Sequence, residues 1–96
     1  GSLRIKILPA SIGKIIHFRK LDLSDNNYIE VLPNSITKLY NLQTLDLSDC
    51  YRLKELPKKF TNLVNLRVLR LDGCENLTLM PFIITWMSKL IKVNHS

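Results

Sequence analysis

One stretch decides how this chain folds, namely residues 42–57, which read LQTLDLSDCYRLKELP. Within it, residues 44–48 alternate apolar with polar side chains, the period-two pattern of a short strand with one buried face. The segment after the turn ends in Pro57, whose ring fixes φ and removes an N–H donor, so this segment cannot be an interior sheet strand. The stretch therefore predicts a strand, a turn and then irregular or 3₁₀ structure.

The same pattern recurs every 24 residues, which proline shows most simply. The prolines are Pro9, Pro33, Pro57 and Pro81. Seven apolar columns keep the same step without an insertion, and one of them consists of Leu21, Leu45, Leu69 and Val93. A helical bundle is the rival interpretation, because Ile36, Leu39 and Leu42 are three residues apart. A bundle has no reason to place proline every 24 residues, so the repeat is favoured.

A single 24-residue unit is too small to fold alone. Burying its seven apolar side chains contributes on the order of 10–20 kcal/mol, whereas ordering its backbone costs about 1–2 kcal/mol per residue. Stacked units bury both flanks and share hydrogen bonds along a parallel sheet. We expect residues 3–96 to form one domain of four repeats without caps, and residues 1–2 to be a scar left by tag removal. Open edges at uncapped ends predict end-to-end or edge-strand self-association.

Composition narrows the function classes. The chain has a formal charge of +6, but its basic residues are scattered, and the densest short stretch is residues 52–59. This distribution favours a solvated face over a nucleic-acid site, and we expect no nucleic-acid partner. No apolar run is long enough to cross a bilayer, so no membrane partner is expected either. Two cysteines are too few for a secreted disulfide scaffold and indicate a reducing compartment.

The segments at residues 42–50 and 53–57 resemble leucine-rich repeats, and the resemblance spans residues 3–95. The finer match is to plant intracellular disease-resistance proteins of the nucleotide-binding, leucine-rich-repeat class (NBS-LRR). It rests on cysteine in the turn, in LDLSDCYRL at residues 45–53 and in LRVLRLDGCENL at residues 66–77. The resemblance implies an α/β horseshoe, a right-handed coil with short parallel strands on the concave face and irregular or 3₁₀ segments on the convex face.

The same resemblance implies a cytoplasmic role in plant defence and innate immunity. Its protein partner would be a pathogen effector, a guarded host protein or the receptor's own nucleotide-binding domain. This chain has no Gly-x-x-x-x-Gly-Lys-Ser/Thr loop, so we expect no nucleotide or other cofactor within it. Two alternatives stay open: a structural scaffold of an intracellular signalling protein, for which Asn26 in the turn is typical, and, more weakly, nucleic-acid binding.

The candidate partner-binding residues are the strand side chains that point away from the core, on the concave face. They are Lys20, Asp22, Ser24, Thr44, Asp46, Ser48, Val68, Arg70, Asp72, Lys92 and Asn94. The alternative is a solvated surface with cross-strand charge pairs such as Asp46 with Arg70. Asp22 and Asp46 are aligned carboxylates, but an open sheet supplies no cleft to perturb their pKa, so we expect no catalytic residues and no enzyme.

Two further groups of residues have structural interpretations. Asn26, Cys50 and Cys74 share the inward turn position, where an amide satisfies buried backbone groups and a thiol tolerates burial. We favour free thiols over a disulfide, although successive turns about 4.8 Å apart would allow one, and we expect no metal site. In the last repeat, residues 82–86 include Phe, Ile and Trp, which form either a partner patch or core.

Overall fold

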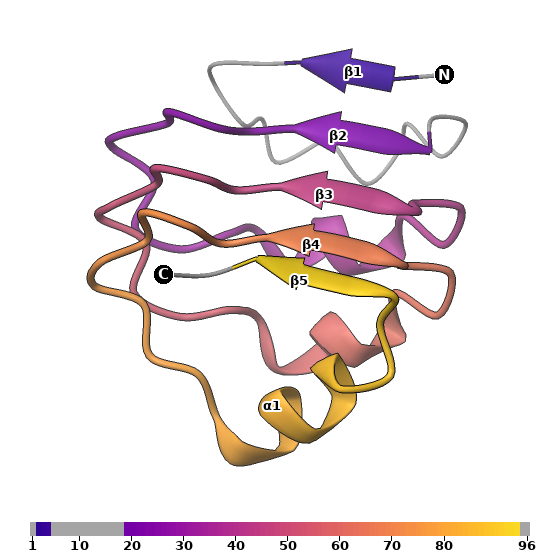
Figure 1. Ribbon diagram of the computed structural model, residues 1–96. Helices are drawn as coiled ribbons and strands as arrows, with labels where there is room; N and C mark the ends of the chain where they lie inside the picture. Colours follow the sequence, from indigo (N-terminus) through magenta and orange to yellow (C-terminus); the bar gives the residue numbers. More distant parts are fainter. Residues whose placement is uncertain (1, 5–18, 95–96) are drawn as a thin grey trace.

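The computed structural model describes residues 2–4 and 19–94. Five short strands of this part form one sheet in the order β1-β2-β3-β4-β5 (Figure 1). The strands are β1 (Ser2–Arg4), β2 (Lys20–Asp22), β3 (Thr44–Asp46), β4 (Val68–Arg70) and β5 (Lys92–Asn94). All four neighbouring pairs run parallel, and β2 to β5 confirm the stacked arrangement that the repeat predicts.

The register follows the 24-residue step from β2 onward. Leu21 pairs with Leu45, and Leu45 pairs with Leu69, so residues of one column lie side by side. The first step is shorter, because Ser2 pairs with Lys20 at a separation of 18 residues (20 − 2). The 24-residue columns do not predict β1, since the position 24 residues before Lys20 lies ahead of the first residue.

The proline segments return on the side of the core opposite the sheet (Figure 1). Two 3₁₀ helices, η2 (Asn34–Lys38) and η3 (Lys58–Asn62), each begin directly after a proline whose ψ, 144° or 145°, is still extended. In the last repeat the α-helix α1 (Pro81–Met87) takes this place, with proline in its first turn. The prediction of irregular or 3₁₀ structure is thus confirmed for the two middle repeats and is wrong for the last.

The core is a stack of equivalent apolar side chains between the sheet and the return segments. In one unit all seven apolar side chains of the repeat pattern are buried, namely Leu45, Leu47, Leu53, Leu56, Phe60, Leu63 and Leu66. Trp86 of α1 packs edge-on against Phe60, with ring centroids 5.6 Å apart. Ile83 is also buried, whereas Phe82 is exposed. The sequence left open whether the apolar side chains of residues 82–86 form a partner patch or core, and Ile83 and Trp86 pack in the core.

The α-helix changes which side chain of the last repeat is buried. The column of Ile36 and Phe60 continues to Ile84, yet Ile84 is 53% exposed and Ile83 only 1%. An α-helix has 3.6 residues per turn and a 3₁₀ helix has 3.0, so the same offset from proline points in a different direction. A place in this apolar column therefore does not put Ile84 in the core. Met80 is likewise exposed, whereas Leu32 and Leu56, its equivalents in the two preceding repeats, are buried.

Each turn after β2, β3 and β4 contains one residue with positive φ. These residues are Asp25 (φ 62°), Asp49 (φ 61°) and Gly73 (φ 81°), again 24 apart. Aspartate tolerates this left-handed region better than most residues. At Gly73 a Cβ atom would lie 2.1 Å from Asp49 Oδ1, so glycine suits both the backbone angle and the lack of space.

Candidate interaction surface

The outward side chains of β2 to β5 form a polar surface, here called the sheet face. It consists of Lys20, Asp22, Thr44, Asp46, Val68, Arg70, Lys92 and Asn94. In each of β2, β3 and β4 the central leucine is buried and its two neighbours are not. The structure thus brings these eight candidate residues together on one sheet, in register along the stack.

Two other candidates do not belong to the sheet face. The prediction for Ser24 and Ser48 is wrong, because each is only 8% exposed. The hydroxyl of Ser24 donates to Asp22 Oδ1 at 2.6 Å, and its N–H donates to the same oxygen at 2.9 Å. Ser48 makes the same two bonds to Asp46. The Asp-x-Ser motif therefore closes the turn, and its serines are not accessible to a partner.

The turn after β4 replaces this motif with Arg70 and Asp72. Arg70 Nη2 lies 3.5 Å from Asp72 Oδ2, and both side chains are partly exposed. Asp46 lies directly beside Arg70 in the strand register, but its Oδ1 accepts the bonds from Ser48. The cross-strand ion pair between Asp46 and Arg70, considered above as an alternative, is not formed.

Charge is distributed unevenly along the strands. The first residue of each strand from β2 to β5 and the residue before it include four cations and no acid: Arg19, Lys20, Arg67 and Lys92. The last residue of β2, β3 and β4 and the three residues after it include five acids and one cation: Asp22, Asp25, Asp46, Asp49, Asp72 and Arg70. The segments where the strands begin are therefore positive, and the strand ends together with the turns that follow them are negative.

The inward turn residues form a ladder from repeat to repeat. Cys50 Sγ donates to the carbonyl of Leu23 at 3.2 Å, and Cys74 Sγ donates to the carbonyl of Leu47 at 3.0 Å. Asn26 Nδ2 donates to the same Leu23 carbonyl at 2.7 Å. Both cysteines are free. Burial raises the pKa of the Cys50 thiol and raises the pKa of Cys74 to about 11, so both thiols are protonated donors at neutral pH and weak nucleophiles.

Residues 2–4 and 19–94 contain no group of three His, Cys, Asp or Glu side chains placed to hold a metal ion. In that same part of the chain, no helix is both long enough and apolar enough to cross a membrane.

Parallel strands stacked in register, each followed by a turn ladder and a proline return segment, define a solenoid repeat protein. Stability in such a protein comes from the contacts between neighbouring units, and the stack presents a continuous surface. A family model described as a leucine-rich repeat region matches residues 6–95, and the chain belongs to the leucine-rich repeat family. Domains of this family generally mediate protein–protein interactions and are generally not enzymes. No curated protein matches the chain.

Proposed function

We propose that this chain is the partner-recognition module of a plant intracellular immune receptor, and that it senses a pathogen effector or a host protein through its sheet face. The observation that carries the proposal is the row of outward side chains on in-register strands. Strands of a sheet lie about 4.8 Å apart, so these side chains stand at fixed spacing. Little conformational entropy is lost when such a preformed surface binds a partner.

In this proposal the sheet face is the concave side of a right-handed coil. Its positive end holds Lys20 and Lys92, and its other end, which adjoins the acidic turns, holds Asp22, Asp46 and Arg70. A partner with the opposite polarity would be oriented along the strands, because complementary potentials steer association and fix the docking register. An elongated partner could lie along the strands in either of two opposite directions, and the charges of the sheet face favour one of them.

The immune-receptor part of the proposal rests on the turn cysteines. Cys50 and Cys74 take the ladder position in the segments that resemble disease-resistance receptors, whereas Asn26 takes it in the preceding turn. The receptor's own nucleotide-binding domain is a further partner of the same face in the cytoplasm. Asn26 favours the second candidate, a scaffold of an intracellular signalling protein. Sequencing the parent gene upstream separates the two, since a phosphate-binding Gly-x-x-x-x-Gly-Lys-Ser/Thr loop is expected only in the receptor.

A charge-reversal experiment tests the sheet face. The wild-type chain and the Lys20→Glu/Lys92→Glu variant are immobilised as bait in leaf extract, and captured proteins are quantified by mass spectrometry. Both lysines are exposed, so the variant is expected to keep the wild-type fold. Asp46 is unsuitable because it holds the turn through Ser48. We expect proteins bound by the wild type to fall about tenfold or more with the variant.

The matched control reverses two exposed cations elsewhere, in Arg52→Glu/Lys89→Glu. It changes the net charge by the same amount, so it accounts for loss of unspecific attraction. Capture that is equal for the wild type and the Lys20→Glu/Lys92→Glu variant would show that partners do not use the sheet face. Equal losses in both variants would mean that only the overall charge matters.

A further inference from the structure

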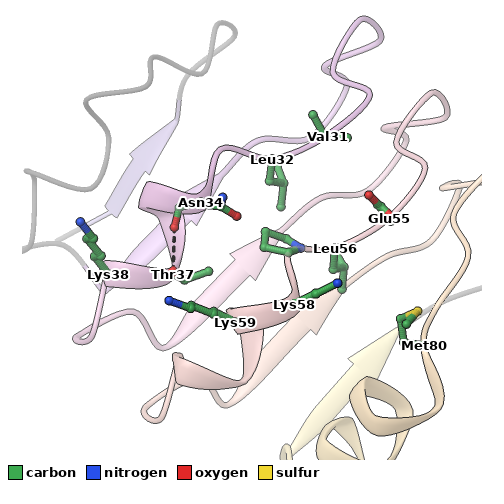
Figure 2. Close-up of a pocket in the computed structure, with 11 residues that line it drawn as sticks. Val31, Leu32, Asn34, Thr37, Lys38, Glu55, Leu56, Lys58, Lys59 and Met80 are labelled. Atoms are coloured by element: carbon green, nitrogen blue, oxygen red, sulfur yellow. Dashed lines mark hydrogen bonds between the residues drawn. The ribbon is translucent and has the colours of Figure 1, made fainter.

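A groove lies on the side of the molecule opposite the sheet, between successive return segments. Its volume is about 620 Å³. Figure 2 shows that three repeats line it: residues 31–38 from one, residues 55–59 from the next and Met80 from the one after. A volume of this size falls within the usual range of roughly 300–1,000 Å³ for sites that bind small molecules or short peptides.

The groove combines an apolar floor with exposed apolar side chains. Leu32 and Leu56 line it but are themselves buried. Val31 and Met80 also line it, and they are 58% and 43% exposed. An apolar side chain of a ligand that packs against Val31 and Met80 would remove this surface from water, which is favourable.

Positive charge surrounds the apolar floor. Lys38, Lys58 and Lys59 line the groove and are exposed, and Glu55 is the one acid among the described lining residues, so the lining charge is +3 − 1 = +2. The ion pairs within the described part of the chain are Lys54 with Glu30, at 2.8 Å, and Arg70 with Asp72. No described carboxylate therefore forms an ion pair with the three groove lysines.

The groove lysines are carried by short, well-bonded elements. Lys38 is the last residue of η2, and Lys58 and Lys59 are the first two residues of η3. The hydroxyl of Thr37 donates to the Asn34 carbonyl at 2.6 Å and ties the two ends of the η2 turn together (Figure 2). The Cα positions of the lysines are thus fixed by the fold, while their side chains remain free to meet a ligand.

We propose that this groove, here called the lysine groove, binds a short acidic peptide segment of a partner protein. The segment runs in extended form across the repeats, places two apolar side chains against Val31 and Met80, and directs its carboxylates to Lys38, Lys58 and Lys59. Charge complementarity and the apolar floor together select this ligand. The inference goes beyond the proposed function, because the lysine groove and the sheet face lie on opposite sides and can bind two partners at once.

The test uses the full chain and a fluorescein-labelled synthetic octapeptide, Glu-Glu-Leu-Glu-Asp-Leu-Glu-Glu, titrated by fluorescence anisotropy at low salt. We expect saturable binding that Lys58→Glu/Lys59→Glu weakens about tenfold or more, and Lys58→Ala/Lys59→Ala weakens to a smaller extent. The control Arg52→Glu/Lys89→Glu has the same net charge as the first variant and is expected to change Kd less than about threefold. Thermal melts confirm that the variants remain folded.

A second peptide tests the contribution of the apolar floor separately from that of the lysines. Replacing both leucines of the octapeptide with serine is expected to weaken binding about fivefold or more, because the apolar floor then has no ligand group to cover it. Equal Kd values for the two peptides would overturn the proposal, and so would an equal loss in the control variant. Absence of peptide binding at millimolar concentration would overturn it as well.

Two further measurements test whether the groove prefers a nucleic acid and whether the sheet face contributes to peptide binding. If an eight-nucleotide single-stranded DNA binds more tightly than the octapeptide, and Lys58→Glu/Lys59→Glu removes that binding, the groove is a nucleic-acid site and the peptide proposal fails. The Lys20→Glu/Lys92→Glu variant is expected to bind the octapeptide like the wild type, which shows that the two surfaces act separately. Failure of the lysine groove would leave the sheet-face experiment unaffected.

Discussion

The middle repeats and the last repeat share one column pattern, but they fold their return segments differently. In the middle repeats a 3₁₀ helix follows proline and buries Ile36 or Phe60. In the last repeat an α-helix begins at proline and buries Ile83 in place of Ile84. The difference shows that the spacing fixes where each segment lies, whereas the local helix type decides which of its side chains face the core.

The turns differ in a similar way. The Asp-x-Ser motif closes the turns after β2 and β3, but Arg70 and Asp72 stand at the equivalent positions after β4. The ladder thiol of Cys50 is fully buried, whereas Cys74 is only partly buried. The turn after β4 therefore lacks the two Asp–Ser hydrogen bonds that close the turns after β2 and β3.

Removal of the central aromatic side chain is expected to have the largest effect. Phe60 is fully buried and contacts Trp86, so Phe60→Ala should lower the free energy of unfolding by about 3–5 kcal/mol. Urea denaturation followed by circular dichroism measures this loss. The matched change Phe82→Ala, at a side chain that is 46% exposed, should cost less than about 1 kcal/mol. Similar losses for the two variants would contradict the assignment of Phe60 to the core.

The helix phase in the last repeat is tested by two neighbouring isoleucines. Ile83→Ala should destabilise the chain by about 2–4 kcal/mol, because its side chain is buried. Ile84→Ala should change the free energy of unfolding by about 0.5 kcal/mol or less, since its side chain is exposed. Chemical denaturation of both variants under one set of conditions gives the comparison. If Ile84→Ala proved the more harmful, α1 would have the 3₁₀ phase of the middle repeats.

Introducing the Asp-x-Ser motif into the turn after β4 should give this turn the hydrogen bonds found after β2 and β3. Arg70→Asp combined with Asp72→Ser recreates Asp-x-Ser after β4 and is expected to stabilise the chain by about 0.5–1.5 kcal/mol, through two added hydrogen bonds. The reverse test, Ser48→Ala, removes a bond of 2.6 Å to Asp46 and should cost about 1 kcal/mol. Differential scanning calorimetry reports both changes. A lower melting temperature for the transplant would show that the turn after β4 cannot accept the motif.

The smallest expected effect is a dependence of stability on alkaline pH. Burial raises the pKa of Cys74 from 9.0 to about 11, so the unfolded chain loses this proton before the folded chain does. The stability that the protonated thiol provides is complete below pH 9 and is lost as the pH rises through about 11. Melting temperatures measured across this range should fall less steeply for Cys74→Ala than for the wild type. Parallel pH profiles would exclude a contribution from Cys74.

Much of the fold can be predicted from the sequence because the same pattern of apolar residues and proline occurs in each 24-residue unit. The alternation around Leu21, Leu45 and Leu69 predicts β2, β3 and β4, and the structure places them in parallel register. Proline predicts the start of η2 and η3, since its φ is fixed and its N–H is missing. The β1 strand was missed because its 18-residue separation from β2 departs from the repeat.

The candidate surface could be predicted only in part. Alternation identifies the sheet face, but it does not show that Ser24 and Ser48 turn inward to bond a carboxylate, because this depends on the turn geometry. The lysine groove was not predicted. The basic stretch at residues 52–59 contains Lys58 and Lys59, but their neighbour Lys38 is about 20 residues away in the sequence and is brought close by stacking alone.

The uniform register from β2 to β5 has a consequence for how such a gene can change. The N–H of Leu23 donates to the Asp46 carbonyl, and the N–H of Leu47 donates to the Arg70 carbonyl, so each unit offers its neighbour the same backbone bonds. Recombination that inserts or removes 24 codons between these strands would leave every backbone donor opposite an acceptor. The length of the chain can therefore vary by whole units while the remaining units keep their shape, so the sheet can become longer or shorter without rebuilding the core.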